Sequence, residues 1–296
     1  MNSFCSPLGL HYLCTRIEGC IRETGGSAVE TSHQEMKIKE VAEALERFAP
    51  LPLQESYDNA GLQIGLTGCE DVSGVLLCLD VTEQVILEAE RLHCNLIVSH
   101  HPLLFRPLKH LTMDTQVGRC VMMAVQRGIA VYSAHTNLDN APGGVNFEMA
   151  SRLGLNDVRF LCMDAAGTGG SGVAGELAKG MPADEFLQFV KQTFGVKQAM
   201  HNVVRAGHEV KRVALCGGAG EFLLGDAVKQ GADAFLTGEM SYHHYFGREE
   251  EILIAVIGHF ESERFTINLL HNILRDSCPG LRLEMTSVNT NPIDFI

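Results

Sequence analysis

Side chains that can bind metal ions follow four apolar runs of this 296-residue chain. The runs are "LIVS", "IAVYSA", "AFLT" and "ILIAVIG", and their composition is typical of buried strands. In open α/β sheets, ligands bind at the carboxyl ends of the strands, so we expect these side chains to gather at such an edge. They are His100 and His101 after the first run, His135 and Asp139 after the second, Glu239, His243 and His244 after the third, and His259 and Glu263 after the fourth.

The spacing of these residues favours metal binding. His259 and Glu263 are four positions apart, so on a helix they share one face. Pro102 biases His101 toward an extended conformation, and successive extended residues point in opposite directions. We therefore expect the imidazoles of His100 and His101 to diverge and to serve two neighbouring ions. Mixed imidazole and carboxylate ligands suit zinc, iron, manganese, cobalt or nickel, without selecting among them.

Each of these residues or residue pairs also has a purely structural interpretation when it is taken alone. A histidine pair is often a surface feature, His135 is a possible hydrogen-bonding residue, and Glu263 close after His259 is ordinary at the start of a helix. The occurrence of all these residues at strand ends is what favours a metal site.

Two other features compete for function. The segment "RVALCGGAGEFL" has the order strand, glycines, helix that can hold a phosphate, but it fits neither G-x-G-x-x-G nor a P-loop. A tight turn with close helix packing is the favoured interpretation. Arg106 and Lys109 follow the histidine pair, where they either attract an anionic substrate or form a solvated basic face.

Composition limits the class of protein. Hydrophobic residues make up 46% and charged residues 20%, as in ordinary globular proteins. The net charge of −13 argues against general nucleic-acid binding. Neither a membrane span nor a signal peptide is expected, because no long apolar run and no basic leader are present. Ten cysteines without a C-x-x-C pair predict free thiols in a reducing cytoplasm. Those predicted to lie in the core are Cys78, Cys94, Cys120, Cys162 and Cys216.

The order of the predicted elements indicates an α/β protein. We expect residues 1–35 to form a poorly ordered N-terminal extension, and a helix to begin near Met36. Strand-like and helix-like runs then alternate, which predicts parallel or mixed sheets flanked by helices. Thr82 is expected to cap one of these helices, and Gly128 to end another.

Six segments, taken in order, resemble those of a known family. They are "YDNAGLQIG", "SHHPLLF", "AHTNLD" with "GGVN", "CGGAG", "GADAFLTGE" and "GHFESE". The chain resembles the Nif-three-like dinuclear metal-centre proteins, also called GTP cyclohydrolase one type two homologues, from about Met36 to the C-terminus. It is similar to the short form of that family, which lacks an extra middle domain.

The resemblance implies a site, a subunit architecture and an assembly. His135 would lie beside two divalent ions, while His243 and His244 would line the cavity. Residues 36–140 with 240–296 would form a first α/β lobe carrying the site, and residues 141–239 a second lobe. The subunits would assemble into a toroidal homohexamer. The implied metal ligands are His100, His101, Asp139, His259 and Glu263, with Glu263 bridging the ions.

Three functional hypotheses follow. The leading one is a metal-dependent hydrolase acting on a nucleotide, as in a GTP cyclohydrolase, or on a phosphoester. In it, Glu263 or Asp139 would hold the ions and His135 or His244 would move a proton. The rival is a non-enzymatic ring that stores or delivers metal or binds a protein partner. The third is a nucleotide-binding regulator that uses the "CGGAG" segment.

Overall fold

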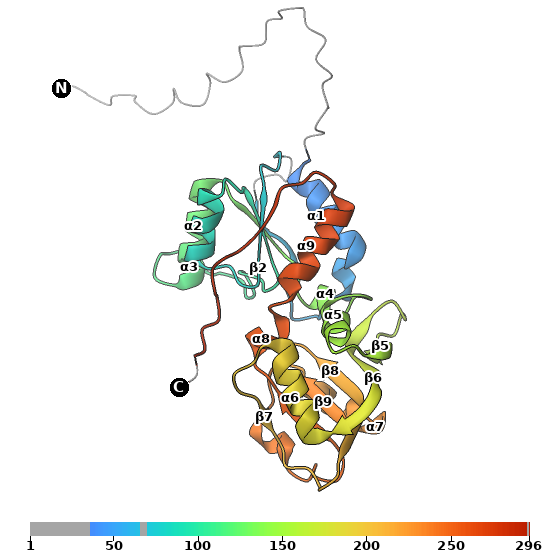
Figure 1. Ribbon diagram of the computed structural model, residues 1–296. Helices are drawn as coiled ribbons and strands as arrows, with labels where there is room; N and C mark the ends of the chain where they lie inside the picture. The colour runs from blue at the N-terminus through green and yellow to red at the C-terminus, as the bar shows by residue number, and fades with distance from the viewer. Residues whose placement is uncertain (1–35, 66–69, 295) are drawn as a thin grey trace, which may run out of the picture. The chain divides into compact units, whose positions relative to one another are not determined.

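The computed structural model describes residues 36–65, 70–294 and 296, and Figure 1 shows their arrangement. The expected N-terminal extension, residues 1–35, lies outside the described residues. The first helix begins at Ile38, close to the expected start at Met36.

A five-stranded sheet forms the first half of the fold. Its outer strand β1 runs antiparallel to β4, and the other strands are parallel to one another. Every residue of β2, β3 and β4 is buried, because helices cover both faces of the sheet. The strand order is β1 (Gly61–Ile64), β4 (Ala130–Ser133), β3 (Leu96–Ser99), β2 (Val75–Cys78) and β11 (Leu283–Met285).

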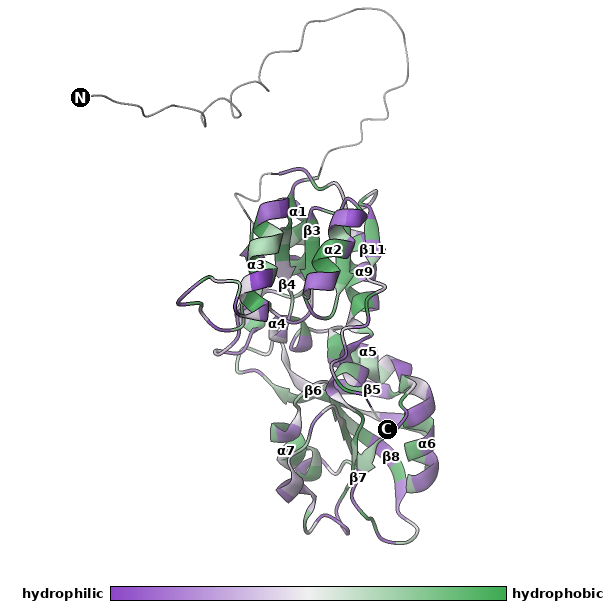
Figure 2. Cartoon of the chain, turned by 90° about the vertical axis from the view of Figure 1, so that its left-hand side faces the viewer, coloured by the Kyte–Doolittle hydropathy of each residue, from purple (hydrophilic) through white to green (hydrophobic). Residues whose placement is uncertain are grey.

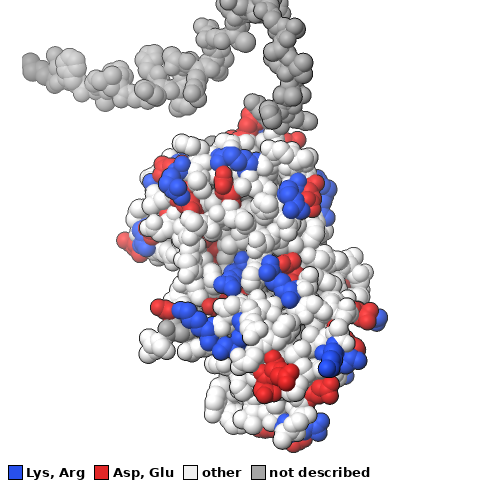
Figure 3. Space-filling view, in the orientation of Figure 1, with Lys and Arg blue, Asp and Glu red and all other residues white. Residues whose placement is uncertain are grey.

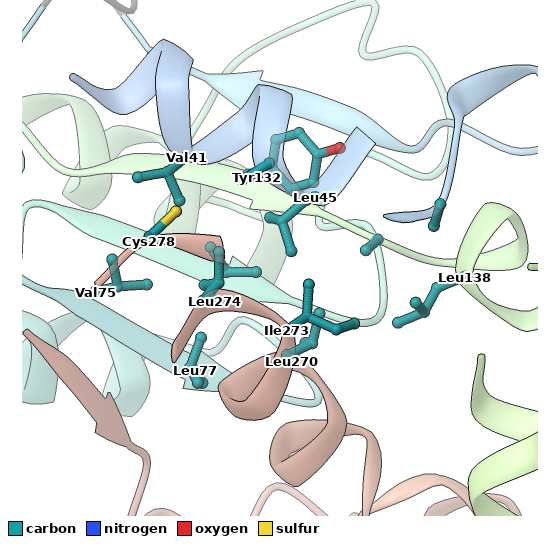
Figure 4. Packing of buried hydrophobic residues seen from close by; sticks show 14 of the residues in the cluster. Val41, Leu45, Val75, Leu77, Tyr132, Leu138, Leu270, Ile273, Leu274 and Cys278 are labelled. Carbon is teal, nitrogen blue, oxygen red and sulfur yellow. The ribbon is translucent and has the colours of Figure 1, made fainter. Parts of the chain in front are cut away.

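The helices over this sheet are amphipathic, and they form two separate cores. In Figure 2, hydrophobic and hydrophilic residues alternate along α2 and α3, while β3 and β4 behind them are hydrophobic. Figure 4 shows the opposite face, where Leu45 of α1 and Leu274 of α9 pack over Leu77 and Tyr132 of the sheet. The pairs are α1 (Ile38–Phe48) with α9 (Thr266–Ser277) on one face, and α2 (Glu83–Arg91) with α3 (Gln116–Arg127) on the other.

A six-stranded mixed sheet forms the second half. Strands β8, β9 and β10 are parallel, and the remaining pairs are antiparallel. Helices α5 (Val145–Arg152) and α6 (Ala183–Phe194) cover one face, and η2 (Glu221–Leu223) with α7 (Leu224–Lys229) covers the other. The strand order is β5 (Asn156–Met163), β6 (Gly170–Pro182), β8 (Glu209–Cys216), β9 (Ala234–Thr237), β10 (Leu253–Val256) and β7 (Met200–His201). Two mixed sheets flanked by helices confirm the predicted α/β class.

Four short helices complete the described elements, and three of them follow strands of these sheets. Helix α4 follows β4, η3 follows β9 and α8 follows β10. They are η1 (Leu51–Leu53), α4 (Thr136–Asp139), η3 (Tyr242–Tyr245) and α8 (His259–Glu263).

The strand pairing differs from the lobe boundary expected at residue 240. Strand β10 pairs in parallel with β9, with Leu253 opposite Ala234, so it belongs to the six-stranded sheet. The chain returns to the first sheet only with α9 and β11. The apolar pattern of "ILIAVIG" identifies a buried strand, but it does not say which sheet that strand joins.

Local signals at the helix ends agree with the structure. The Thr82 hydroxyl accepts a hydrogen bond from the Val85 amide at 3.3 Å, which caps α2 as predicted. Gly128 ends α3 with φ +65°, a conformation that glycine adopts without strain. Over the described residues, every helix is too short or too polar to cross a bilayer.

One of the predicted core cysteines is exposed. Cys78, Cys94, Cys120 and Cys216 are buried, but Cys162 is not. It lies on β5, an edge strand of which Leu161 alone is buried, so the apolar run around it does not enter the core.

Leu274 tests how much the core under α9 contributes to stability. Its side chain is fully buried, so Leu274→Ala should lower the free energy of unfolding by about 2–5 kcal/mol. Leu87→Ala is the matched control, because Leu87 on α2 is 40% exposed and should cost far less. Denaturant unfolding measures both variants, and equal losses would contradict the assignment of α9 to the core.

Candidate metal centre

Six side chains from three distant segments meet at the carboxyl ends of strands from both sheets. Each segment directly follows a parallel strand, so the backbone turns at the sheet edge and releases its side chains there. The side chains are His100 and His101 after β3, His135 and Asp139 at the two ends of α4, and His259 and Glu263 in α8.

Glu263 is the centre of this cluster. Its Oε2 lies 2.9 Å from His101 Nε2 and 3.0 Å from His259 Nε2, and those two nitrogens are 3.3 Å apart. Its other oxygen, Oε1, lies 3.9 Å from His100 Nε2, which is 3.7 Å from Asp139 Oδ1. One carboxylate therefore faces two different sets of imidazoles with its two oxygens.

Two overlapping groups of potential ligands result. One group consists of His100, His101 and His135, and the other of His101, His259 and Glu263. Within each group, the ligand atoms lie within 4.8 Å of one another. The i, i+4 relation of His259 and Glu263 on one helix is confirmed by α8.

Every imidazole of the cluster is held by its Nδ1 atom. An acceptor oxygen lies 2.7–2.8 Å from each Nδ1, which fixes a proton there and turns the Nε2 atom toward the cluster. This arrangement is characteristic of histidines that bind metal. The acceptors are the Ala134 carbonyl for His100, Asp80 for His101, Asp58 for His135 and Glu239 for His259.

His100 provides the test of whether a metal fits. Its side chain is fully buried, and its Nε2 has no hydrogen-bond partner among the described residues. An unsatisfied buried polar group costs about 1–3 kcal/mol. Atoms bound to one zinc-like ion at roughly 2.1 Å lie about 3–4 Å apart, which matches the separations from Asp139 and Glu263. The donor set therefore fits divalent metal ions.

The titration behaviour of the cluster reflects its buried charges. Burial alone would raise the pKa of Glu263, but its contacts with the imidazoles hold it well below its usual range. Burial alone would lower the pKa of His101, but its hydrogen bonds to Asp80 and Glu263 raise it to about 10. Burial and the nearby Glu263 raise the pKa of Asp139. Without a metal ion, protons on the imidazoles therefore balance the charge of Glu263.

The "CGGAG" segment supports Glu263 and does not form a phosphate cradle. A side chain on Gly218, whose φ is +59°, would place its Cβ 2.3 Å from Glu263 Oε1, so only glycine fits there. Three backbone amides of the segment already donate hydrogen bonds within the protein. They are Gly217 to Asn146, Gly218 to Ser262 and Gly220 to Thr237.

The histidine pair diverges less than the sequence indicated. The ring centroids of His100 and His101 are 4.9 Å apart, and the ring planes are inclined by 44°. Strand β3 ends at Ser99, so both histidines lie in the following bend, where side chains no longer alternate. The two rings nevertheless face different oxygens of Glu263.

The structure does not bring His243 and His244 to the cluster. Both belong to η3, and His244 Nε2 lies 3.9 Å from Glu221 Oε2. Neither is among the residues that line the two cavities next to the cluster. Their two signals were a position shortly after a strand end and the family resemblance, and η3 turns them aside.

Two cavities border the cluster. One has a volume of about 440 Å³ and reaches His101 and His259; the other, of about 220 Å³, reaches Asp139 and Glu263. Phe105, His135 and His259 line both. A small molecule can thus reach the imidazoles of His101, His135 and His259, whereas His100 lines neither cavity.

The fold and the cluster define an α/β protein with a histidine–carboxylate site suited to metal. The chain matches the sequence pattern of the Duf34/NIF3 (NGG1p interacting factor 3) family over residues 36–292, and it belongs to that family. This confirms the resemblance noted in the sequence.

Individual relatives support the same assignment. A Clostridium perfringens protein named GTP cyclohydrolase 1 type 2 homolog is 38% identical over 235 residues, which cover 77% of this chain and 87% of the relative. A Helicobacter pylori protein named GTP cyclohydrolase 1 type 2 is 32% identical over 228 residues, with the same coverage of 77% and 87%. A crystal structure of a Staphylococcus aureus hypothetical protein superposes with a TM-score of 0.80 at 28% identity, covering 88% of this chain and 99% of that one.

Proton release offers a first test of the cluster. Metal ions bind deprotonated imidazoles. In the metal-free protein, His101 and His259 have pKa values raised to about 10 and about 9, so both carry protons at neutral pH. Zinc uptake should therefore release protons, and the apparent affinity should rise with pH until about pH 9–10. Zinc titrations across this range measure the effect, and an affinity independent of pH would contradict the ligand assignment.

Gly218→Ala tests the support behind Glu263. The added methyl group would collide with the carboxylate, so metal affinity should fall by about 10–100-fold. Gly231→Ala is the matched control, because its φ is +68° and the added methyl group meets nothing within 4 Å. Competition with a chromophoric zinc chelator compares them, and equal affinities would show that the backbone does not position Glu263.

Proposed function

We propose that this chain binds two divalent metal ions and acts as a metal-dependent hydrolase on a nucleotide or a phosphoester. The observation that carries the proposal is the convergence of imidazole Nε2 atoms, each held by its Nδ1, on the shared carboxylate of Glu263. The residues that would hold the ions are His100, His101, Asp139, His259 and Glu263, and Glu263 would share its two oxygens between the ions.

The roles of the residues follow from their contacts. Two divalent ions, when bound, would activate a water molecule and offset the charge that develops on a substrate oxygen. His135 is the group we assign to proton transfer, because it lines both cavities and is not among the five ligands assigned above. Burial alone would raise the pKa of Asp58, but hydrogen bonds from His135 and Thr136 lower it to about 2, so this carboxylate stays ionised and holds His135 in place. His244 has no role in this mechanism.

A nucleotide substrate is supported by the name of the Helicobacter pylori relative and by the surroundings of His135. Phe105 lies edge-on to His135, with ring centroids 6.0 Å apart, and Tyr57 lies edge-on to Phe105 at 6.4 Å. Aromatic side chains of this kind provide stacking surfaces for a heterocyclic ring. A small anionic substrate would then present its phosphate or carbonyl oxygen to the ions.

The alternative is a non-enzymatic ring that delivers metal or binds a protein partner. The family description, which refers to a factor that interacts with NGG1p, supports a partner-binding role. We propose a homohexamer for either function. Basic and acidic side chains are interspersed on the face seen in Figure 3, which gives no support to general nucleic-acid binding.

Metal analysis followed by a turnover screen tests the hydrolase. Protein purified without added ions should contain two divalent ions per chain, and it should hydrolyse GTP, another nucleotide or a phosphoester. His135→Gln should lower turnover about a hundredfold or more while metal content stays unchanged. Glu263→Gln should lose metal and activity together, and the exposed Glu185→Gln on α6 is the control.

The opposite outcome would favour the non-enzymatic role. It consists of metal-loaded protein that turns over none of these compounds, while a Glu263→Ala variant still binds its protein partners.

A further inference from the structure

The segment after β11, residues 286–294, is attached to the rest of the protein by hydrogen bonds to acidic side chains. It is drawn in dark red in Figure 1 where it runs to the C-terminus, and we call it the C-terminal tail. Its first anchor is Glu88, a buried residue of α2 whose carboxylate accepts hydrogen bonds from the hydroxyls of Thr286 and Ser287.

Its next two anchors lie beside the candidate metal ligands. The Thr290 hydroxyl donates to Asp80 Oδ2 at 2.6 Å, and the other oxygen of Asp80 holds His101 Nδ1 at 2.7 Å. The Asn291 amide donates to Glu261 Oε1 at 3.0 Å. Glu261 lies in α8, between His259 and Glu263, so the tail connects the end of β2 to the helix that carries two ligands.

The tail also forms one wall of the larger cavity. Asn291, Pro292 and Ile293 line the 440 Å³ space together with His101 and His259. Ile293 is 58% exposed, so its apolar side chain borders the cavity and contributes little to a core.

We propose that the C-terminal tail contributes to the metal site in two separate ways. Thr290 is a positioning residue that orients His101 through Asp80, and residues 291–293 limit the size of the molecule that reaches the ions. The inference rests on the metal site of the proposed function, but not on hydrolysis.

The lining of the cavity indicates the kind of ligand. Imidazoles and carboxylates line the side of the cavity next to the cluster, whereas Phe105, Phe260 and Pro292 supply apolar surface. The cavity therefore suits a molecule with one oxygen-bearing end for the ions and an apolar or ring-shaped body against these side chains. The tail would stop a longer body from extending past Pro292.

Two variants and one control separate these effects. Thr290→Val removes the hydroxyl with almost no change in shape. Deletion of residues 290–296 removes the wall but keeps the anchor at Glu88, and residues 292–294 are exposed, so little core is lost. Thr168→Val is the control, because its hydroxyl also donates to a carboxylate, that of Asp164, but it lines neither cavity.

Zinc affinity, the visible spectrum of the cobalt-loaded protein and the rate of zinc removal are the measurements. Thr290→Val should weaken zinc binding about tenfold, the lower end of the range for losing a group behind a ligand, and should alter the cobalt spectrum. The deletion should do the same and should also accelerate zinc removal by a bulky chelator far more than by a small one. Thr168→Val should match the wild type, and thermal unfolding should confirm that all variants fold.

The outcomes distinguish this proposal from the proposed function. If Thr290→Val keeps the zinc affinity and cobalt spectrum of the wild type, Thr290 does not position His101. If the deletion accelerates zinc removal equally for both chelators, the tail does not limit access to the site. A wild-type chain that takes up no zinc or cobalt would overturn both the site and the role of the tail. Metal uptake that responds to the tail, in a protein without hydrolytic activity, would overturn the hydrolase alone.

Discussion

The buried carboxylate of Glu263 is the feature on which the rest of the site depends. A charge taken out of water is tolerated only where opposite charge or hydrogen bonds compensate for it, and here imidazoles surround both oxygens. Other features follow from this requirement. Gly218 lets the backbone approach the carboxylate, and α8 sets His259 one turn away from it. In the metal-free protein, protons on the imidazoles compensate for the charge of Glu263, and in the metal-bound protein the ions would do so.

The position of Glu263 couples the site to the whole fold. It is 162 positions from His101 in the sequence, and it follows a strand of the other sheet. The two ligands therefore belong to segments that follow strands of different sheets, and they meet only in the folded arrangement of both. A metal ion bound between them would therefore stabilise the folded arrangement of both sheets, since the unfolded chain offers no such site.

The sequence predicted which residues form the cluster better than it predicted how they are arranged. A single rule, polar residues after buried strands, located all six side chains, because it depends only on local pattern. Sheet membership of β10 depends on pairing between distant segments, which periodicity does not encode. The same limit applies to Asp58, whose role arises from contact with a histidine 77 positions away. Asp80 is different, because it follows the buried strand β2, so the rule should have included it. His244 shows the converse, because a metal-competent residue after a strand is turned aside by η3.

The balance between rigidity and access distinguishes possible uses of the site. A structural metal site is closed by protein ligands, whereas a catalytic one keeps a position open. Here the ligands are held in place, because an oxygen contacts each imidazole at its Nδ1. The His259 side chain nevertheless remains 35% exposed, and it lines both cavities. A purely structural metal site, which is closed by protein ligands, would gain nothing from that opening. The open side next to the fixed ligands leaves room for the reaction proposed above and equally for the delivery of ions, and it is the side bordered by Phe105 and the C-terminal tail.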